Sequence, residues 1–224
     1  MDGRMDTGAV SATASVRSAS LASKRFRAGP REWYTAGVLA LGIDPGTLNL
    51  GWGVVEREGN RLRHVAHGVV RLKPGAALAH RLVDIAEALS EVISVHKPVV
   101  GSVESLFFHK DAQAASKLGH ARGVVLLCLA RANVDVFEYP PARVKRTLVG
   151  HGQADKRQMA LMVRAVLGLA EPPASDAADA LALAITHLRV GTLIRALSEA
   201  APDPRSPRQR LLVALGQKRR ARPL

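Results

Sequence analysis

Four acidic residues are spaced so that one folded domain can gather them at a single point. Asp44 and Glu104 each end an apolar run, and two neighbouring parallel strands would bring both carboxylates to the same edge of a sheet. Asp176 and Asp179 are three residues apart, which places both on one face of a helix. Clustered carboxylates repel one another, and their pKa values rise unless a cation offsets the charge. The pattern therefore indicates a cage for Mg²⁺ or Mn²⁺, the hard cations that all-oxygen ligation selects.

Each carboxylate also has a simpler structural interpretation when it is taken alone. Asp44 precedes a Pro-Gly pair and could form a turn, and Glu104 could be an exposed residue at a strand end. Asp176 could stabilise the start of a helix. Asp179 lies among alanines and leucines, where a surface position explains it poorly. Taken together, the four residues favour the metal site.

The chain between residues 38 and 190 carries the patterns of the strands and helices that would position these carboxylates. Alternating or continuous apolar runs predict strands at 38–44, 50–56, 62–72, 99–104 and 134–138. Helical spacing of apolar residues predicts helices at 76–96, 111–131, 142–149 and 155–167, and a last helix from about 172. A meander followed by strand–helix units predicts an α/β fold, with a mixed five-stranded sheet and helices on both faces.

The formal net charge of +13 over 224 residues is unevenly distributed. It amounts to +3 in residues 1–37, +4 in residues 38–189 and +6 in residues 190–224. We predict a disordered basic N-terminal extension at 1–37, a folded domain at 38–190 and a basic C-terminal tail at 191–224. The domain stays positive despite its acidic cluster, which favours a polyanion such as nucleic acid as partner. For the tails alone, solvation explains the charge equally well.

Several features indicate a cytoplasmic protein without a membrane role. No apolar run approaches the length that spans a bilayer. Cys128 is the only cysteine, so an internal disulfide is excluded, and its apolar surroundings predict a buried thiol. The Arg- and Ser-rich composition of residues 1–37 leaves open an organelle transit peptide or a start codon assigned too far upstream.

Six segments of the chain resemble the bacterial RuvC Holliday junction resolvases, members of the RNase H-like nuclease superfamily. These segments are LGIDPGT at 41–47, VES at 103–105 with Phe107, KLGHARG at 117–123, VFEY at 136–139, VKRTLVG at 144–150 and DAADALA at 176–182. They occur in the order and spacing of the family. The long N-terminal extension departs from the family pattern, in which the first strand begins almost at the initiator methionine.

The resemblance implies that Asp44, Glu104, Asp176 and Asp179 are a catalytic tetrad that holds two Mg²⁺ ions per active site, with Mn²⁺ as a substitute. It implies a structure-selective endonuclease that resolves Holliday junctions in homologous recombination and DNA repair. The expected products of its paired, symmetric nicks carry a 5′-phosphate and a 3′-hydroxyl. In two-metal chemistry one ion lowers the pKa of a bound water and the other stabilises the leaving oxygen.

The resemblance also implies residues that contact DNA. Lys145 and Lys156 match family positions beside the scissile phosphate, and Phe107 matches an aromatic that stacks on bases near the crossover. Three arginines surround the lysines and are expected to add backbone affinity that weakens with salt, although solvated helix faces explain them too. These arginines are Arg143, Arg146 and Arg157. No histidine is assigned to catalysis.

Other functions remain open at this point. The segment at 42–47 resembles the first phosphate loop of the actin, Hsp70 and sugar-kinase class, but those proteins need a second, duplicated domain and a second glycine-rich loop, and the sequence shows neither. An RNase H-type ribonuclease has the same expected fold. A noncatalytic junction-binding relative is the third alternative, against which the intact acidic residues argue.

The expected partners follow from the substrate. A four-way junction DNA has two strands to be cut symmetrically, so a homodimer with two-fold symmetry matches it. The predicted helix at 111–131, with its apolar segment at 124–129, is the candidate interface, unless that segment is buried within the monomer. By resemblance, the RuvA–RuvB branch-migration complex is a further expected partner.

Overall fold

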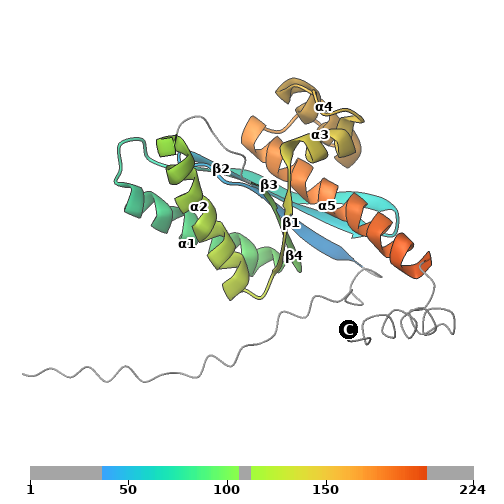
Figure 1. Cartoon of the computed structure of the whole chain (residues 1–224), viewed down its shortest axis with the longest axis horizontal. Coiled ribbons are helices and arrows are strands. Elements are labelled where there is room, and N and C mark those ends of the chain that lie inside the picture. Colours follow the sequence, from blue (N-terminus) through green and yellow to red (C-terminus); the bar gives the residue numbers. More distant parts are fainter. Residues whose placement is uncertain (1–36, 106–111, 201–224) are drawn as a thin grey trace, which may run out of the picture. The chain divides into compact units, whose positions relative to one another are not determined.

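The computed structural model describes residues 37–105 and 112–200, except for the side chains of 112, 114 and 191–200. Five strands and five helices follow one another in this part of the chain (Figure 1). They are β1 (Val38–Asp44), β2 (Asn49–Glu58), β3 (Arg61–Arg71), α1 (Leu78–His96), β4 (Val100–Glu104), α2 (Ala112–Arg131), β5 (Asp135–Tyr139), α3 (Pro141–Val149), α4 (Lys156–Leu167) and α5 (Ser175–Ala200).

The strands form one mixed sheet in the order β3-β2-β1-β4-β5. β1 to β3 are an antiparallel meander, whereas β4 and β5 run parallel to β1. The predicted mixed five-stranded sheet is therefore confirmed. Parallel neighbours need a crossover connection, and α1 and α2 provide the two that this sheet requires.

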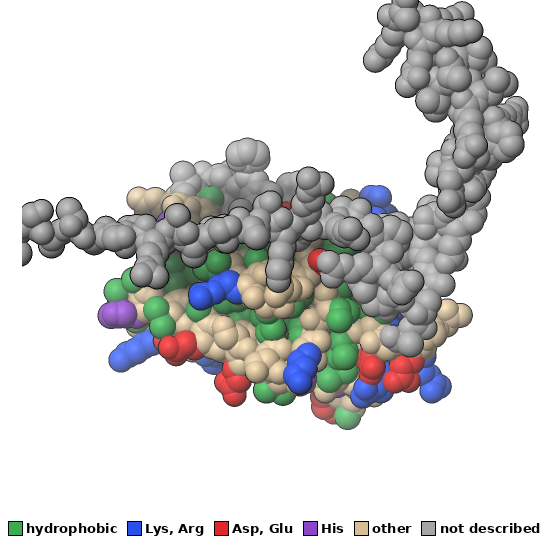
Figure 2. Space-filling view, turned by 90° about the horizontal axis from the view of Figure 1, so that it is seen from below, with side chains coloured by type: hydrophobic (Ala, Val, Ile, Leu, Met, Phe, Trp, Pro, Cys, Tyr) green, Lys and Arg blue, Asp and Glu red, His purple; other side chains and the backbone are tan. Residues whose placement is uncertain are grey.

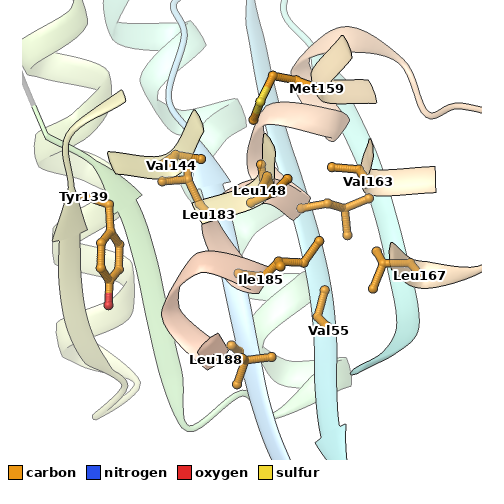
Figure 3. Close-up of a cluster of buried hydrophobic side chains, with 14 of the residues drawn as sticks. Val55, Tyr139, Val144, Leu148, Met159, Val163, Leu167, Leu183, Ile185 and Leu188 are labelled. Atoms are coloured by element: carbon orange, nitrogen blue, oxygen red, sulfur yellow. The ribbon is translucent and has the colours of Figure 1, made fainter. Parts of the chain in front are cut away.

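Helices cover both faces of the sheet, as predicted (Figure 1). α1 and α2 pack on one face over a core that includes Leu41, Ile85 and Leu129. α3, α4 and α5 cover the other face, and Figure 3 shows how side chains of α3 and α4 point toward α5 and β2. Because the sheet is apolar on both faces, it is fixed between two helical layers.

All of the predicted elements are present, and their ends differ by a few residues. α5 begins at Ser175 rather than near 172, because Pro172 and Pro173 disfavour a helical conformation in the residue before each of them. α5 also continues to Ala200, so the predicted boundary at 190 falls inside this helix. Residues 1–36 and 201–224 lie outside the described part of the chain, and the structure does not test the predictions for the two tails.

α5 packs directly on the backbone of the sheet. A methyl group at Gly42 would overlap the carbonyl oxygen of Ala180, and one at Gly51 would overlap that of Asp176. The helix is therefore closer to β1 and β2 than any residue with a side chain would allow at those two positions. This approach sets the position of the first turns of α5.

Cys128 is buried under α1, as the sequence predicts. In the part of the chain that the structure describes, none of the helices has the length and apolar character needed to cross a membrane. Figure 2 shows one face of the domain, on which Lys and Arg side chains are interspersed with Asp and Glu side chains. The two signs of charge are thus mixed over the described surface that is visible in this view.

Candidate active site

The ends of β1 and β4 bring the first two carboxylates together. Ile43 pairs with Val103 in the parallel ladder, so Asp44 and Glu104 are the next residue of each strand. Side chains alternate along a strand, and Gly42, two residues before Asp44, contacts α5. Asp44 therefore lies on the α5 face of the sheet, at the edge that the sequence predicted.

The first turns of α5 supply the other two carboxylates. Gly51 pairs with Asp44 across the antiparallel ladder and also contacts the backbone of Asp176. Asp179 follows one turn later. The alanines between and after the two aspartates are buried, since only small side chains fit where the helix meets the sheet. Ala177, Ala178 and Ala180 are these residues.

Electrostatic coupling shows that the four carboxylates lie near one another. The pKa of Asp44 is raised to about 7, first by burial and then by the negative charges of Asp179, Glu104 and Asp176, in that order. Lys156 opposes this rise. Asp44 thus interacts electrostatically with each of the other three carboxylates. A proton relieves the repulsion in the metal-free protein, and a divalent cation would relieve it more completely.

Both lysines predicted beside the scissile phosphate lie near this acidic group. The Nζ atom of Lys156 is 3.5 Å from Oδ2 of Asp179 and 3.3 Å from Oγ of Ser175. Burial raises the pKa of Asp179, whereas Lys156, through its charge and hydrogen bond, and Lys145, through its charge, lower it. The structure therefore places two cations of α3 and α4 against the carboxylates of α5.

A capping box fixes where α4 begins and hence where Lys156 lies. Asp155 accepts a hydrogen bond from the backbone N–H of Gln158 at 2.8 Å, and the Gln158 side chain accepts one from the backbone N–H of Asp155 at 3.0 Å. Such reciprocal bonds satisfy two helix-end donors. Lys156 is the first residue of the helix and is held at its N-terminus beside α5.

The donor set of the site suits a hard divalent cation. Asp44, Glu104, Asp176 and Asp179 offer carboxylate oxygens only, the ligands that Mg²⁺ prefers. Among the described residues, however, no three His, Cys, Asp or Glu side chains are arranged around one ion position. An ion bound by these carboxylates would therefore have to draw their side chains closer together.

The other residues predicted to contact DNA are three exposed arginines and Phe107. Arg143 and Arg146 are exposed on α3, and Arg157 is exposed on α4 next to Lys156. The guanidinium of Arg143 lies over the ring of Tyr139, 5.7 Å from its centroid. Phe107 lies outside the described residues. The helices that carry the lysines thus also carry the three arginines.

Two arginines that the sequence analysis did not single out donate hydrogen bonds to backbone carbonyl groups at the site. Arg81 donates to the carbonyl oxygen of Thr47, in the loop after Asp44, at 2.7 Å. Arg122 donates to the carbonyl oxygen of Glu104. Arg122 could have been found from the sequence, because it is a charged residue on the apolar face of a predicted helix, between the buried Ala121 and Val125.

Comparisons with known proteins identify the family of the chain. The profile of the family described as Crossover junction endodeoxyribonuclease RuvC matches residues 40–187. The crossover junction endodeoxyribonuclease RuvC of Sorangium cellulosum is 57% identical over 171 residues, which cover 76% of this chain and 96% of the relative.

Solved structures give the same result. RuvC of Thermus thermophilus in complex with a Holliday junction substrate is 40% identical, with a TM-score of 0.66 over 70% of this chain and 96% of that one. The yeast mitochondrial Holliday junction resolvase Ydc2 is 13% identical, with a TM-score of 0.55 over 72% of this chain and 82% of that one, and supports the RNase H-like fold alone. The chain therefore belongs to the RuvC family of crossover junction endodeoxyribonucleases.

Proposed function

We propose that this protein resolves four-way DNA junctions in homologous recombination and repair by paired, symmetric, Mg²⁺-dependent nicks that leave a 5′-phosphate and a 3′-hydroxyl. The grouping of Asp44 with the other three carboxylates carries the proposal: Asp44 and Glu104 end neighbouring parallel strands, and the start of α5 contacts the strand residue that pairs with Asp44. The family match over residues 40–187 supports the substrate class.

The proposed metal ligands are Asp44, Glu104, Asp176 and Asp179. When bound, two Mg²⁺ ions would supply a water of lowered pKa and positive charge at the leaving oxygen, and Mn²⁺ would substitute for them. Asp44 must lose the proton that its raised pKa retains before its carboxylate can serve fully as a ligand. Cleavage should therefore depend on metal concentration more strongly at low pH than at high pH.

The two lysines are proposed to hold the phosphate that is cut. Lys156 neutralises part of the charge of Asp179 in the metal-free protein, and a bound cation would leave its ammonium available for a phosphate oxygen. Lys145 lies close enough to affect the same carboxylate. A cation at this position stabilises the charge that develops during phosphodiester cleavage.

Phe107 and the three arginines complete the proposed DNA contacts. By its resemblance to the aromatic that the family has three residues after the glutamate, Phe107 would stack on bases next to the crossover. The exposed arginines would bind backbone phosphates on either side of the lysines. Arg143, Arg146 and Arg157 are these arginines.

The exposed side of α2 is the proposed homodimer interface. Val125, Cys128 and Leu129 are buried in the monomer core, whereas Leu127 is 55% exposed. A Cβ added at Gly119 or Gly123 would meet nothing within 4 Å. Most of the apolar segment thus packs within the monomer, and Leu127 with the small residues Gly119 and Gly123 offers a surface that a second copy of the helix could approach closely.

The family match supports two further proposals. The protein acts in the cytoplasm, and it works with the RuvA–RuvB branch-migration complex. Both rest on the resemblance of the chain to bacterial RuvC proteins.

A cleavage assay on three substrates tests the function. A synthetic four-way junction, a linear duplex and an RNA–DNA hybrid are incubated with Mg²⁺ and, separately, with EDTA. Paired nicks in the junction that require Mg²⁺ support the proposal. Cleavage of the hybrid alone would identify an RNase H-type ribonuclease, and binding without cleavage would identify a noncatalytic junction-binding protein.

A further inference from the structure

Arg122 connects β4, which ends at Glu104 of the candidate active site, with the adjacent strand β5. It lies in α2, and its side chain is 7% exposed. Its Nη1 donates a hydrogen bond to the backbone carbonyl oxygen of Glu104. Its Nη2 lies 2.7 Å from Oε2 of Glu138 in β5. One guanidinium group thus holds the last residue of β4 and a residue of the adjacent strand.

These contacts are made where the ladder between β4 and β5 ends. Glu138 pairs with Val103, and Glu104 pairs with Tyr139. The backbone N–H of Ser105 donates to the carbonyl oxygen of Tyr139 at 3.0 Å, which is the next bond of the ladder. A guanidinium has donors in a fixed planar fork, so it sets both the distance and the angle between the groups that it joins.

The burial of Arg122 is not explained by stability alone. A buried charge is costly unless it is paired and hydrogen-bonded, and a buried ion pair often stabilises a protein no more than apolar residues of similar volume. The side chain of Glu138 is 49% exposed, so the pair is only partly shielded from water. An apolar residue at position 122 would fit the buried face of α2, between Ala121 and Val125.

We propose that Arg122 is a positioning residue for Glu104, oriented in turn by Glu138. By fixing the carbonyl oxygen of Glu104, it restricts the backbone from which the carboxylate extends toward the acidic group. This inference rests on the proposed role of Glu104 as a metal ligand. A ligand whose backbone is free to move must be ordered when the ion binds, which lowers the affinity for the ion.

Metal binding without DNA tests the proposal. Mn²⁺ is titrated calorimetrically into the full chain and into Arg122→Ala, Arg122→Lys and Glu138→Gln. Residues that orient a metal ligand typically change metal affinity about 10–100-fold when they are lost. We expect at least about a tenfold loss for Arg122→Ala and smaller losses for the two milder variants. Hydrogen exchange of the Ser105 amide, which reports the end of the ladder, should become faster in Arg122→Ala.

A control variant and a DNA-binding measurement show whether a change in Mn²⁺ affinity is specific to Arg122. Arg63 forms ion pairs with Glu56 and Glu58 far from the site, so Arg63→Ala should leave Mn²⁺ affinity unchanged. Junction affinity in EDTA should be the same for all of these variants, since none is proposed to contact DNA.

Two results would overturn an assignment. The positioning role is overturned if folded Arg122→Ala binds Mn²⁺ as tightly as the wild type. If Arg122→Ala does not fold, the role is overturned when Arg122→Lys and Glu138→Gln both bind Mn²⁺ as tightly as the wild type. Wild-type affinity in Glu104→Gln would instead remove the proposed metal site itself.

Discussion

The ammonium of Lys156 lies 3.5 Å from the Oδ2 atom of Asp179, so a cation of α4 already offsets part of the acidic charge of α5 before any metal binds. The side chain of Lys156 is 75% exposed, and that of Asp179 is 31% exposed. Solvent therefore screens this ion pair, and its contribution to stability is small. The pair is better suited to exchange partners when a phosphate and a cation arrive.

Lys156→Met should lower the rate of cleavage more than the affinity for DNA. The variant loses the charge that we propose to stabilise the transition state, so kcat at saturating junction should fall about 10²–10³-fold. Arg157→Met at the neighbouring exposed position is the control, and it should mainly weaken junction binding and reduce the dependence of binding on salt. Equal losses of kcat in the two variants would contradict a specific role for Lys156.

Asp44→Asn should stabilise the metal-free protein at neutral and alkaline pH. The pKa of Asp44 is about 7 in the folded state, above the ordinary value of 3.8, so the folded state keeps a proton that the unfolded state releases. Stability is therefore lost as the pH rises from about 4 to about 7, and the loss is complete above pH 7. Asp44→Asn does not have this loss, so above pH 7 its free energy of unfolding should exceed that of the wild type by a few kcal/mol at most.

Urea unfolding of the metal-free protein in EDTA at pH 4.5 and pH 8 checks this prediction. The variant should gain stability over the wild type only at pH 8, while losing Mg²⁺-dependent cleavage. Asp84→Asn, at an exposed position of α1, is the control and should change neither. A variant without any gain at pH 8 would show that burial and the neighbouring carboxylates do not raise the pKa of Asp44.

Gly42→Ala should destabilise the domain and abolish cleavage together. The added methyl group would overlap the backbone of α5, which no rotamer change can relieve, and overpacking of this kind costs about 1–3 kcal/mol or more. Displacing α5 would also move Asp176 and Asp179 away from Asp44. Thermal unfolding and junction cleavage measure the two effects.

Gly152→Ala is the matched control for this substitution. The nearest heavy atoms to a Cβ there are 3.8 Å away, so the midpoint of unfolding should stay near that of the wild type. If Gly42→Ala behaved like this control, the close contact between α5 and β1 would not be required.

His187 should make the protein less stable below pH 6.5. Burial first, and then the charge of Arg57, lower the pKa of His187 to about 4. The unfolded state therefore takes up a proton that the folded state excludes, and stability falls as the pH drops from about 6.5 to about 4. His187→Gln does not titrate and can keep a hydrogen bond with Tyr139, so its urea midpoint should vary less over this range. His80→Gln, at an exposed position, should leave the wild-type slope unchanged.

The sequence predicted the fold well because its patterns are local. β1 was predicted with the bounds that the structure gives it, since an apolar run bounded by a Pro-Gly turn leaves little ambiguity. The start of α5 was predicted a few residues early, because the Pro-Pro pair precedes the helix rather than beginning it. The predicted boundary at 190 lies ten residues before the end of α5, since Gly191 follows Val190 like a stop signal but lies inside the helix, which ends two residues before Pro202.

The grouping of Asp44 with Asp176 depends on contacts that no local pattern contains. Spacing predicted that each carboxylate lies at a strand end or in a helix start and that one domain could gather all four, and the family resemblance implied the same group. The roles of Gly42 and Gly51 could not be predicted, because they depend on which helix crosses which strand. Arg122 was missed for the same reason, as its partners belong to two other elements.

Because α5 packs on Gly42 and Gly51, the proposed site can form only after α5 has been synthesised. Asp176 and Asp179 lie in the last element of the domain, so they join Asp44 only after nearly the whole domain has been synthesised. The antiparallel strands can pair earlier, while the chain is still growing. A nascent or truncated chain that lacks α5 would thus carry two acidic strand ends without a complete nuclease centre. With the proposed metal ligands, the order of the elements along the chain would keep an unfinished chain from cutting DNA.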